Sequence, residues 1–341
     1  MEFYIERFIP KLRIHCKFKG DLIASRGYEI YRSKDLGKNW EFLNALPINR
    51  YKNLISRHLF ARRLLRTNIS IIKVIDNNNV LIGCDRELFL SDLNFSTFHS
   101  MNIPIRSFQF LRNSICISPK YVYYGEYFPN LFGDNVLIYR SENGVYWNAV
   151  YSFEKNAIRH IHLIQYDKFS NRIWFSSGDK DKECILGNCN YDFSDIKIIG
   201  KGELKWRCLD LFFSNRNVYW GTDNPSGKNY LISYNRYSKQ IRKLSEFPGP
   251  IYHLIKFEQG FLIITQTERG KGELSHNSHL WFSRNLGDEW IECLSYKKDW
   301  LPNIFGFGFL HFGAACKDKV FLSGSGLNGV DDKSLVLKFE N

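Results

Sequence analysis

One short pattern, S-x-[DN]-x-G-x-x-W, constrains the fold of this chain more than any other feature. Residues 33–40 read SKDLGKNW, residues 283–290 read SRNLGDEW, and residues 141–147 read SENGVYW, a copy one residue shorter. Residues 91–98, SDLNFSTF, look like a decayed fourth copy. The pattern predicts a hairpin turn, because Asp or Asn can bond backbone amides, glycine permits positive φ, and the Trp can pack back between sheets.

A motif that recurs in this way indicates an internal structural repeat. With the motif as a fixed point, the chain divides into units at residues 11–46, 68–101, 107–153, 160–201, 205–247, 250–296 and 306–341. Aromatic residues make up 16% of the chain, which favours strands. The last unit offers only three strands, at 307–315, 319–324 and 334–339, whereas residues 2–8 form a spare strand.

Placing the N-terminal strand in the last sheet would close a ring and remove an exposed edge. We therefore predict an all-β fold in which residues 1–341 form a single β-propeller domain. Seven blades fit the units best, and six blades are the alternative. Residues 49–66 are expected to form a helical insertion before the second unit.

The repeated motif resembles the Asp box of the sialidase-like, or BNR-repeat, β-propellers, and the likeness covers most of the chain as architecture. In that family the box lies between outer strands, usually far from the active site, so the resemblance implies a fold rather than an activity. Residues 7–10 read RFIP, one residue longer than the Arg-Ile-Pro motif of sialidases, and a Tyr/Glu nucleophile pair cannot be placed. Arg26 sits roughly where the family has a substrate-binding arginine.

Two further likenesses concern the candidate site. The His-x-His of His160 and His162 is similar to a feature of propeller-type oligogalacturonate lyases, which use histidines with a divalent metal to remove a proton next to a uronate carboxylate. The segments GEYF (125–128), RHIH (159–162), GD (178–179) and WGTD (220–223) are similar to those of uncharacterised bacterial and archaeal BNR-like proteins. That resemblance supplies no activity.

Propeller geometry predicts where polar side chains converge. The innermost strand of each blade begins, and the second strand ends, at the same face of the disc. Most of the second-strand ends carry a carboxylate, and most of the innermost-strand starts carry Arg or His. We therefore expect a polar pocket at one mouth of the central tunnel.

We assign roles within that pocket by residue type. The acid–base or catalytic candidates are His160, His162, Glu126, Asp179 and Asp223. The substrate-binding candidates are Arg26, Arg66, Arg106, Tyr127, Arg159, Trp206, Arg207, His253 and Glu268. Guanidinium groups match carboxylates bidentately, and two imidazoles at i and i+2 can chelate one metal or serve in proton transfer. His160 and His162 are thus candidate ligands for Mn, Ca or Zn, with metal-free substrate contact and a structural pair as the alternatives.

Charge and composition narrow the function. The net charge is +12, which favours an anionic partner such as an acidic polysaccharide. The chain lacks a P-loop, a GxSxG elbow, an HExxH motif and helix-turn-helix or RNP signals, so a glycan is favoured over nucleic acid. Eight scattered Cys without a CxxC pair, and no long apolar run, lead us to expect a reduced cytoplasmic protein without a membrane span.

The predicted function is a hydrolase or lyase acting on a uronate- or sialate-containing oligosaccharide. The alternative is a non-catalytic propeller scaffold that binds a glycan or a protein.

Overall fold

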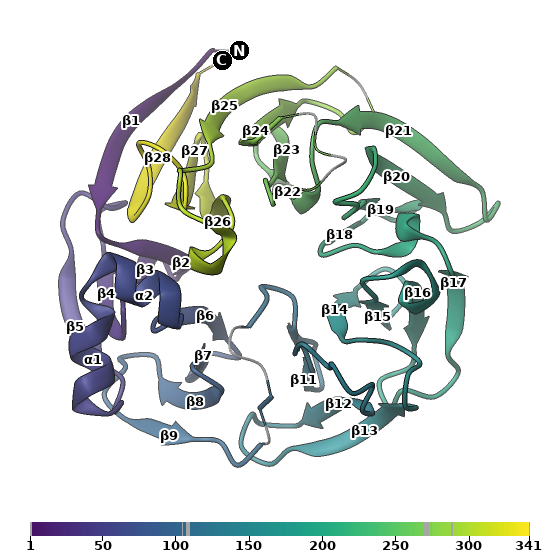
Figure 1. Cartoon of the computed structure of the whole chain (residues 1–341), viewed down its shortest axis with the longest axis horizontal. Helices are drawn as coiled ribbons and strands as arrows, with labels where there is room; N and C mark the ends of the chain where they lie inside the picture. The colour runs from purple at the N-terminus through teal and green to yellow at the C-terminus, as the bar shows by residue number, and fades with distance from the viewer. Residues whose placement is uncertain are drawn as a thin grey trace.

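The computed structural model describes residues 2–103, 105–106, 110–268, 270, 273, 275–287 and 289–340. Within these residues, seven four-stranded antiparallel sheets are arranged in a ring around a central axis (Figure 1). The prediction of a seven-bladed β-propeller is therefore confirmed. None of the described helices is long and apolar enough to cross a membrane.

The first three blades follow one another along the chain. Blade 1 contains β2 (Arg13–Phe18), β3 (Asp21–Arg26), β4 (Glu29–Ser33) and β5 (Glu41–Ala45). Blade 2 contains β6 (Ile69–Val74), β7 (Asn79–Cys84), β8 (Glu87–Asp92) and β9 (Phe98–Ser100). Blade 3 contains β10 (Ile115–Ile117), β11 (Val122–Gly125), β12 (Val136–Ser141) and β13 (Asn148–Phe153).

The next three blades repeat this order. Blade 4 contains β14 (Ile161–Asp167), β15 (Arg172–Ser177), β16 (Ile185–Cys189) and β17 (Lys197–Lys201). Blade 5 contains β18 (Leu211–Phe213), β19 (Asn217–Gly221), β20 (Asn229–Asn235) and β21 (Ile241–Phe247). Blade 6 contains β22 (Ile251–Phe257), β23 (Gly260–Thr265), β24 (Asn277–Ser283) and β25 (Ile291–Lys297).

Blade 7 closes the ring as expected. It contains β26 (Phe309–Cys316), β27 (Lys319–Ser325) and β28 (Lys333–Glu340), and β1 (Glu2–Pro10) pairs antiparallel with β28 as the outer strand. Both ends of the chain therefore lie side by side at the rim (Figure 1). Because β1 continues into β2 of blade 1, its pairing with β28 joins the first blade to the last and closes the ring.

The predicted helical insertion is also present. It consists of α1 (Arg50–Ser56) and α2 (Leu59–Leu65), and Asn49 caps α1 by accepting a hydrogen bond from the Tyr51 backbone N–H at 2.9 Å. Arg63 in α2 forms ion pairs with Asp299 and Asp331. The insertion is therefore anchored to the loops of blades 6 and 7. Short 3₁₀ turns occur at η1 (Asp181–Glu183), η2 (Leu204–Trp206) and η3 (Asn303–Phe305).

The hydrophobic core lies between blades rather than at the axis. In the described part of the chain, seven apolar clusters each join the facing sides of two neighbouring sheets. Between blades 4 and 5, for example, Trp174 packs with Trp206 and Trp220. Burying a large aliphatic or aromatic side chain stabilises a fold by about 1.5–3 kcal/mol, so every blade depends on both neighbours.

The turns formed by the repeated motif lie between the third and fourth strands of blades 1, 3 and 6. In the first copy, Asp35 accepts from the backbone N–H groups of Lys38 and Asn39 at 3.1 and 2.8 Å, and Ser33 accepts from Gly37 N–H at 2.8 Å. Trp40 then packs against the cluster between blades 7 and 1. The motif therefore forms a turn near the outer edge of its blade.

Backbone hydrogen bonds join adjacent blades near the tunnel mouth. The carbonyl of Glu126, just after β11, accepts from the Ile161 N–H at 2.8 Å, and Thr222, after β19, accepts from Ile251 at 3.0 Å. At Gly221 a Cβ would collide with the Ile251 side chain, so this second strand ends in glycine to let the next blade approach. The end of one second strand is thereby fixed beside the start of the next inner strand.

Candidate active site at the tunnel mouth

A cavity of about 1030 Å³ occupies the centre of the ring and is lined by residues from all seven blades and from α2. Five inner strands carry a β-bulge where they face it. The bulged residues, all of which line the cavity, are His15, Ser70, His162, Tyr252 and Gly313. Bulges re-aim side chains, so they change which residues reach the axis.

Most of the predicted site residues do line this cavity. They are Arg26, Arg66, Tyr127, Arg159, His160, His162, Asp179, Arg207, Asp223, His253 and Glu268. The expected convergence of carboxylates from second-strand ends with Arg and His from inner-strand starts is therefore present in this part of the structure.

Three predicted residues lie elsewhere. Glu126 is 1% exposed, and Arg106 binds it through both carboxylate oxygens and stacks 3.7 Å from the centroid of the Phe128 ring. The second Glu126 oxygen also accepts from the Leu137 backbone N–H at 2.8 Å. Trp206 packs in the core between blades 4 and 5. Glu126 and Arg106 are thus engaged with each other, Trp206 is part of the core, and none of the three lines the cavity.

His160 and His162 form the centre of the site. Their Nε2 atoms lie 2.9 Å apart, and Asp179 Oδ1 lies 3.4 Å from each of them. The two imidazoles are 4% and 2% exposed. Three ligand atoms at these spacings suit one small divalent cation, because ligands about 2.0–2.1 Å from a tetrahedral metal lie about 3.4 Å from one another.

The protonation of the pair follows from its surroundings. His160 Nδ1 lies 3.0 Å from the Phe128 carbonyl, so Nδ1 carries the proton and Nε2 presents a lone pair. Burial lowers the pKa of His162 to about 3, against the partial compensation of Asp179, so this imidazole is neutral at pH 7. Tyr127 packs on His160 with ring centroids 4.2 Å apart. The carbonyl and the tyrosine ring thus fix the orientation of the His160 imidazole, with Nε2 facing His162 and Asp179.

Two arginines hold the carboxylate of Asp179. Arg159 Nη1 lies 3.0 Å from Oδ2, and an Arg207 Nη lies 3.4 Å from Oδ1. The pKa of Asp179 is well below its usual range because its contacts with His160 and His162 outweigh the opposing effect of burial. Asp179 is therefore a fixed anion beside the imidazoles.

A second pair of acids lies beside the first. Asp223 is 1% exposed, and its Oδ2 accepts from Arg207 Nε at 2.8 Å, while Oδ1 has no hydrogen-bond partner among the described residues. Burial raises the pKa of Asp223 above its ordinary value. Burial and the charge of Asp223 raise the pKa of Glu268 to about 7, and Tyr252 donates a hydrogen bond to Glu268. Glu268 can therefore gain or lose a proton near neutral pH.

Sequence reasoning missed several cavity residues. Lys73 and Arg112 line the cavity, as does Arg63 of α2. Arg112 lies in the connection before β10 and Lys73 lies late in β6, so neither is at the strand start that the sequence argument considered. The sequence signal that could have placed Lys73 in the cavity was the alternation of side chains between the two faces of β6.

Comparisons with known proteins identify the architecture. No family model and no curated protein matches the chain. The solved structure of an oligogalacturonate lyase in complex with manganese aligns over 98% of this chain and 90% of its own chain, with 10% identity and a TM-score of 0.63. The Pan2 WD40 domain of Neurospora crassa aligns over 98% and 89%, with 11% identity and a TM-score of 0.56.

The extracellular domain named as that of a one component system from B. thetaiotaomicron aligns over 99% of this chain, with 13% identity and a TM-score of 0.60. This chain spans only 40% of the length of that structure. At such identities these likenesses show a shared propeller fold and nothing finer.

Proposed function

We propose that this protein is an enzyme that acts on an acidic oligosaccharide at the tunnel mouth, by β-elimination at a uronate residue. The observation that carries the proposal is the placement of His160, His162 and Asp179, whose ligand atoms all lie within 4.8 Å of one another, in the same cavity as Glu268. The cavity volume of about 1030 Å³ leaves room for a sugar chain and speaks against a mouth plugged by aromatic side chains.

His160, His162 and Asp179 would hold the divalent cation. Bound there, a cation such as Mn²⁺ would neutralise the uronate carboxylate and so acidify the adjacent C–H. The oligogalacturonate lyase of similar fold was solved with manganese, which supports this choice of metal and substrate class. Arg66 and Arg159 also line the cavity and add positive charge for further uronate groups.

Glu268 is the proposed base. Its pKa of about 7 lets a substantial fraction be ionised at neutral pH while it remains basic enough to accept a proton. Removal of the proton next to the carboxylate places its electron pair in a new C=C bond, the C–O bond to the leaving sugar breaks, and that oxygen takes up a proton. The reaction needs no further reactant.

Hydrolysis is the second candidate. It is favoured by the pair Asp223 and Glu268, two cavity carboxyls whose pKa values are both raised. Glycoside hydrolysis uses such a pair as acid and base. The alternative to both reactions is non-catalytic glycan binding, which would not require the raised pKa values of Asp223 and Glu268.

The deciding experiment is incubation of the protein with uronate- and sialate-containing oligosaccharides, each with EDTA or with Mn²⁺, Ca²⁺ or Zn²⁺. Elimination gives an unsaturated sugar and no change in total mass. Hydrolysis gives products that together gain one water. No conversion on the whole panel, with unchanged thermal stability on adding glycans or metals, would contradict the enzymatic proposal.

A further inference from the structure

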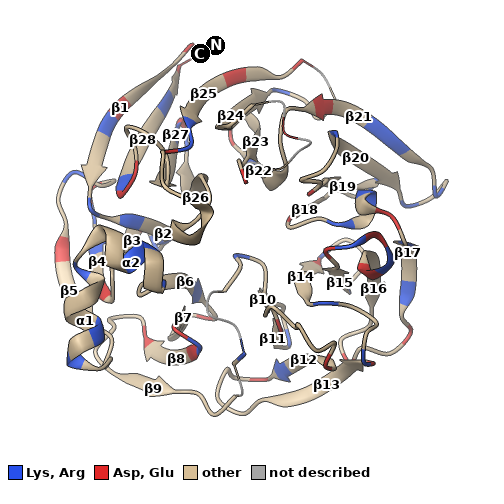
Figure 2. Ribbon diagram, in the orientation of Figure 1, with Lys and Arg blue, Asp and Glu red and all other residues tan. Residues whose placement is uncertain are grey.

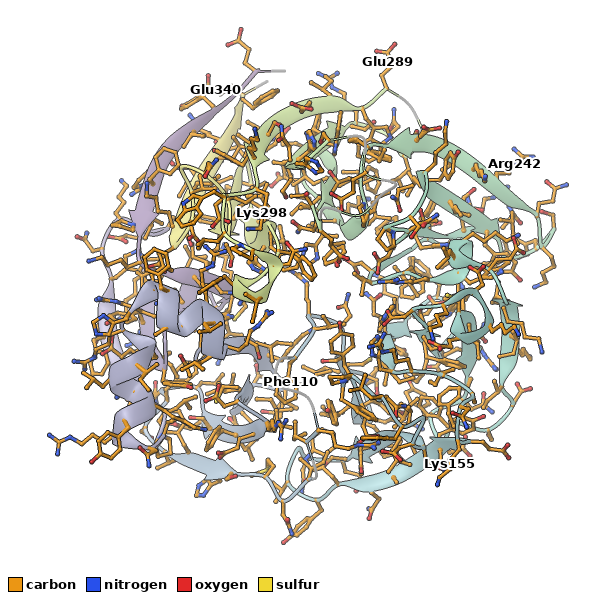
Figure 3. The ribbon with its side chains drawn as sticks, viewed as in Figure 1. Phe110, Lys155, Arg242, Glu289, Lys298 and Glu340 are labelled. Carbon is orange, nitrogen blue, oxygen red and sulfur yellow. The ribbon has the colours of Figure 1, made fainter. Side chains whose placement is uncertain are left out.

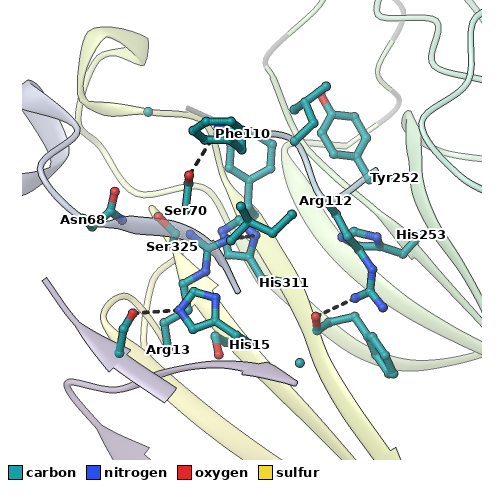
Figure 4. A pocket seen from close by; sticks show the side chains of 18 of the residues that line it. Arg13, His15, Asn68, Ser70, Phe110, Arg112, Tyr252, His253, His311 and Ser325 are labelled. Carbon is teal, nitrogen blue, oxygen red and sulfur yellow. Dashed lines mark hydrogen bonds between the residues drawn. The ribbon is translucent and has the colours of Figure 1, made fainter. Parts of the chain in front are cut away.

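The cavity wall includes a second group of side chains besides those of the mouth described above. Five basic side chains from blades 1, 2, 3, 6 and 7 line the same cavity, and we call them the cation ring. They are Arg13, Lys73, Arg112, His253 and His311. Figure 4 shows four of them, all but Lys73, around the same space, and Figure 2 shows basic residues on β2 and β6 beside the centre of the ring.

The two arginines and the lysine of the ring lack anionic partners. Across the described residues, no carboxylate forms an ion pair with Arg13, Lys73 or Arg112. Arg13 contacts the ring of His311 at 3.4 Å, and Arg112 donates to the Phe312 carbonyl at 2.7 Å. These three side chains are only partly exposed, and cations shielded from bulk water are ordinarily paired, so three of them around one cavity call for a counter-charge.

The nearest carboxylate is committed to neutral donors. Asp210 Oδ1 accepts from Asn113 at 3.0 Å and Gln165 at 3.1 Å, and Oδ2 accepts from the Leu254 backbone N–H at 3.2 Å. His253 Nδ1 is 3.9 Å from Asp210 and has no hydrogen-bond partner among the described residues, although His253 is only 8% exposed. The ring thus contains an unsatisfied polar atom as well as unbalanced charge.

Titration behaviour agrees with this geometry. Burial and the neighbouring Arg112 lower the pKa of Lys73 to about 8, and burial lowers the pKa of Arg13 to about 10. The pKa of His311 falls well below its usual value, through burial first and then through Arg13, His253 and other cations. Each of these groups is less favourably charged than it would be in water, chiefly because its surroundings shield it from solvent, and nearby negative charge does not make up for this.

We propose that the cation ring is a binding site for a doubly charged tetrahedral oxyanion, the group shared by phosphate and sulfate. Arg and Lys side chains present only donors, which such an anion can accept at every oxygen. Three side chains that are largely cationic at pH 7 favour a dianion, since a single negative charge would leave most of the imbalance in place. The ring residues are not those proposed to hold the metal or to accept the proton, so the anion site does not depend on the proposed enzymatic activity.

The test measures binding of inorganic phosphate and of sulfate to the full chain by titration calorimetry and thermal unfolding, without metal or glycan and at constant ionic strength in chloride. Saturable binding and a rise in Tm are expected for both anions and not for chloride. The variant carrying Lys73→Gln and Arg112→Gln should bind at least about tenfold more weakly.

The matched control carries Lys155→Gln and Arg242→Gln, again one lysine and one arginine. Both of these side chains are exposed and lie at the outer rim, far from Phe110 near the axis (Figure 3). This control should bind the anions like the wild type. Lys73→Gln alone is the second variant should the double variant fail to fold, because the Lys73 side chain forms no hydrogen bond with the residues that the structure describes. Absence of saturable binding, or equal binding by the cation-ring variants and the wild type, would overturn the proposal.

Discussion

The mouth of the tunnel and the cation ring both contain basic side chains, but two arginines of the mouth are paired with carboxylates, whereas the arginines and the lysine of the ring are not paired with any described carboxylate. At the mouth, Arg159 and Arg207 are paired with Asp179, and Arg207 also binds Asp223. In the ring, Arg13 and Lys73 have no such partner within the described structure. The comparison teaches that charge type alone does not define a site, because a paired arginine positions a carboxylate whereas an unpaired one attracts an anion.

The largest expected effect concerns the metal ligands of the mouth. His162→Ala should weaken binding of Mn²⁺ by about 100-fold or more, since loss of a direct ligand exceeds the 10–100-fold typical of second-shell partners. Calorimetric titration with Mn²⁺ measures it, and His99→Ala, at an exposed position on β9, is the control. An unchanged Mn²⁺ affinity in His162→Ala would refute the proposed ligand set and leave the anion site untouched.

The next effect contrasts one arginine of each region. Arg207→Gln should lower the free energy of unfolding by about 3 kcal/mol, because it leaves Asp179 and Asp223 without their shared cation. Arg112→Gln should cost less than about 1 kcal/mol in phosphate-free buffer, since it relieves an unbalanced cation. Urea unfolding measures both. Equal losses in the two variants would contradict the comparison.

A smaller effect is expected in the pH dependence of stability at Lys73. Its pKa in the folded protein, about 8, lies below the ordinary 10.5, so the unfolded chain binds more protons between these values. The stability of the wild type relative to Lys73→Met should therefore rise by about 2–3 kcal/mol as pH increases from 8 to 10.5. Urea unfolding of both proteins across this range tests it, and a constant difference would show that Lys73 titrates normally.

The last effect has the opposite slope and belongs to the mouth. The pKa of Glu268, about 7, lies above the ordinary 4.5, so the folded protein binds more protons in this window. The stability of the wild type relative to Glu268→Gln should fall by about 2–3 kcal/mol as pH increases from 4.5 to 7. Chemical unfolding in buffers spanning this window provides the measurement. A rising difference would mean that the carboxylate is stabilised rather than disfavoured by its surroundings.

Much of the fold follows from local pattern. The turns formed by the repeated motif, the seven repeat units and the spare N-terminal strand all depend on short stretches of sequence, and the structure contains each of them. The convergence of His160, His162, Asp179, Asp223 and Glu268 follows from strand order, because every blade starts and turns at the same face. The resemblance to the sialidase-like family remains a prediction from the motif.

The pairing of side chains could not be predicted in the same way. Glu126 directly follows the last residue of β11, whereas Asp223 lies two residues after the end of β19, and Arg106 and the Leu137 N–H occupy the Glu126 carboxylate outside the cavity. Trp206 begins an inner segment but turns into the core between blades. Both outcomes depend on residues from neighbouring segments that strand periodicity does not register.

By itself, then, the sequence determined the repeat, the closure of the ring and the face at which polar residues gather, because these depend on spacing along the chain. Only the tertiary structure decided which charges are neutralised. The bulge at His162 brings two imidazole nitrogens to 2.9 Å, and Arg112 and Lys73 face a common space without a carboxylate partner in the described structure. The physical reason is that ion pairing depends on distances of a few ångströms between blades, which are set by packing across the ring.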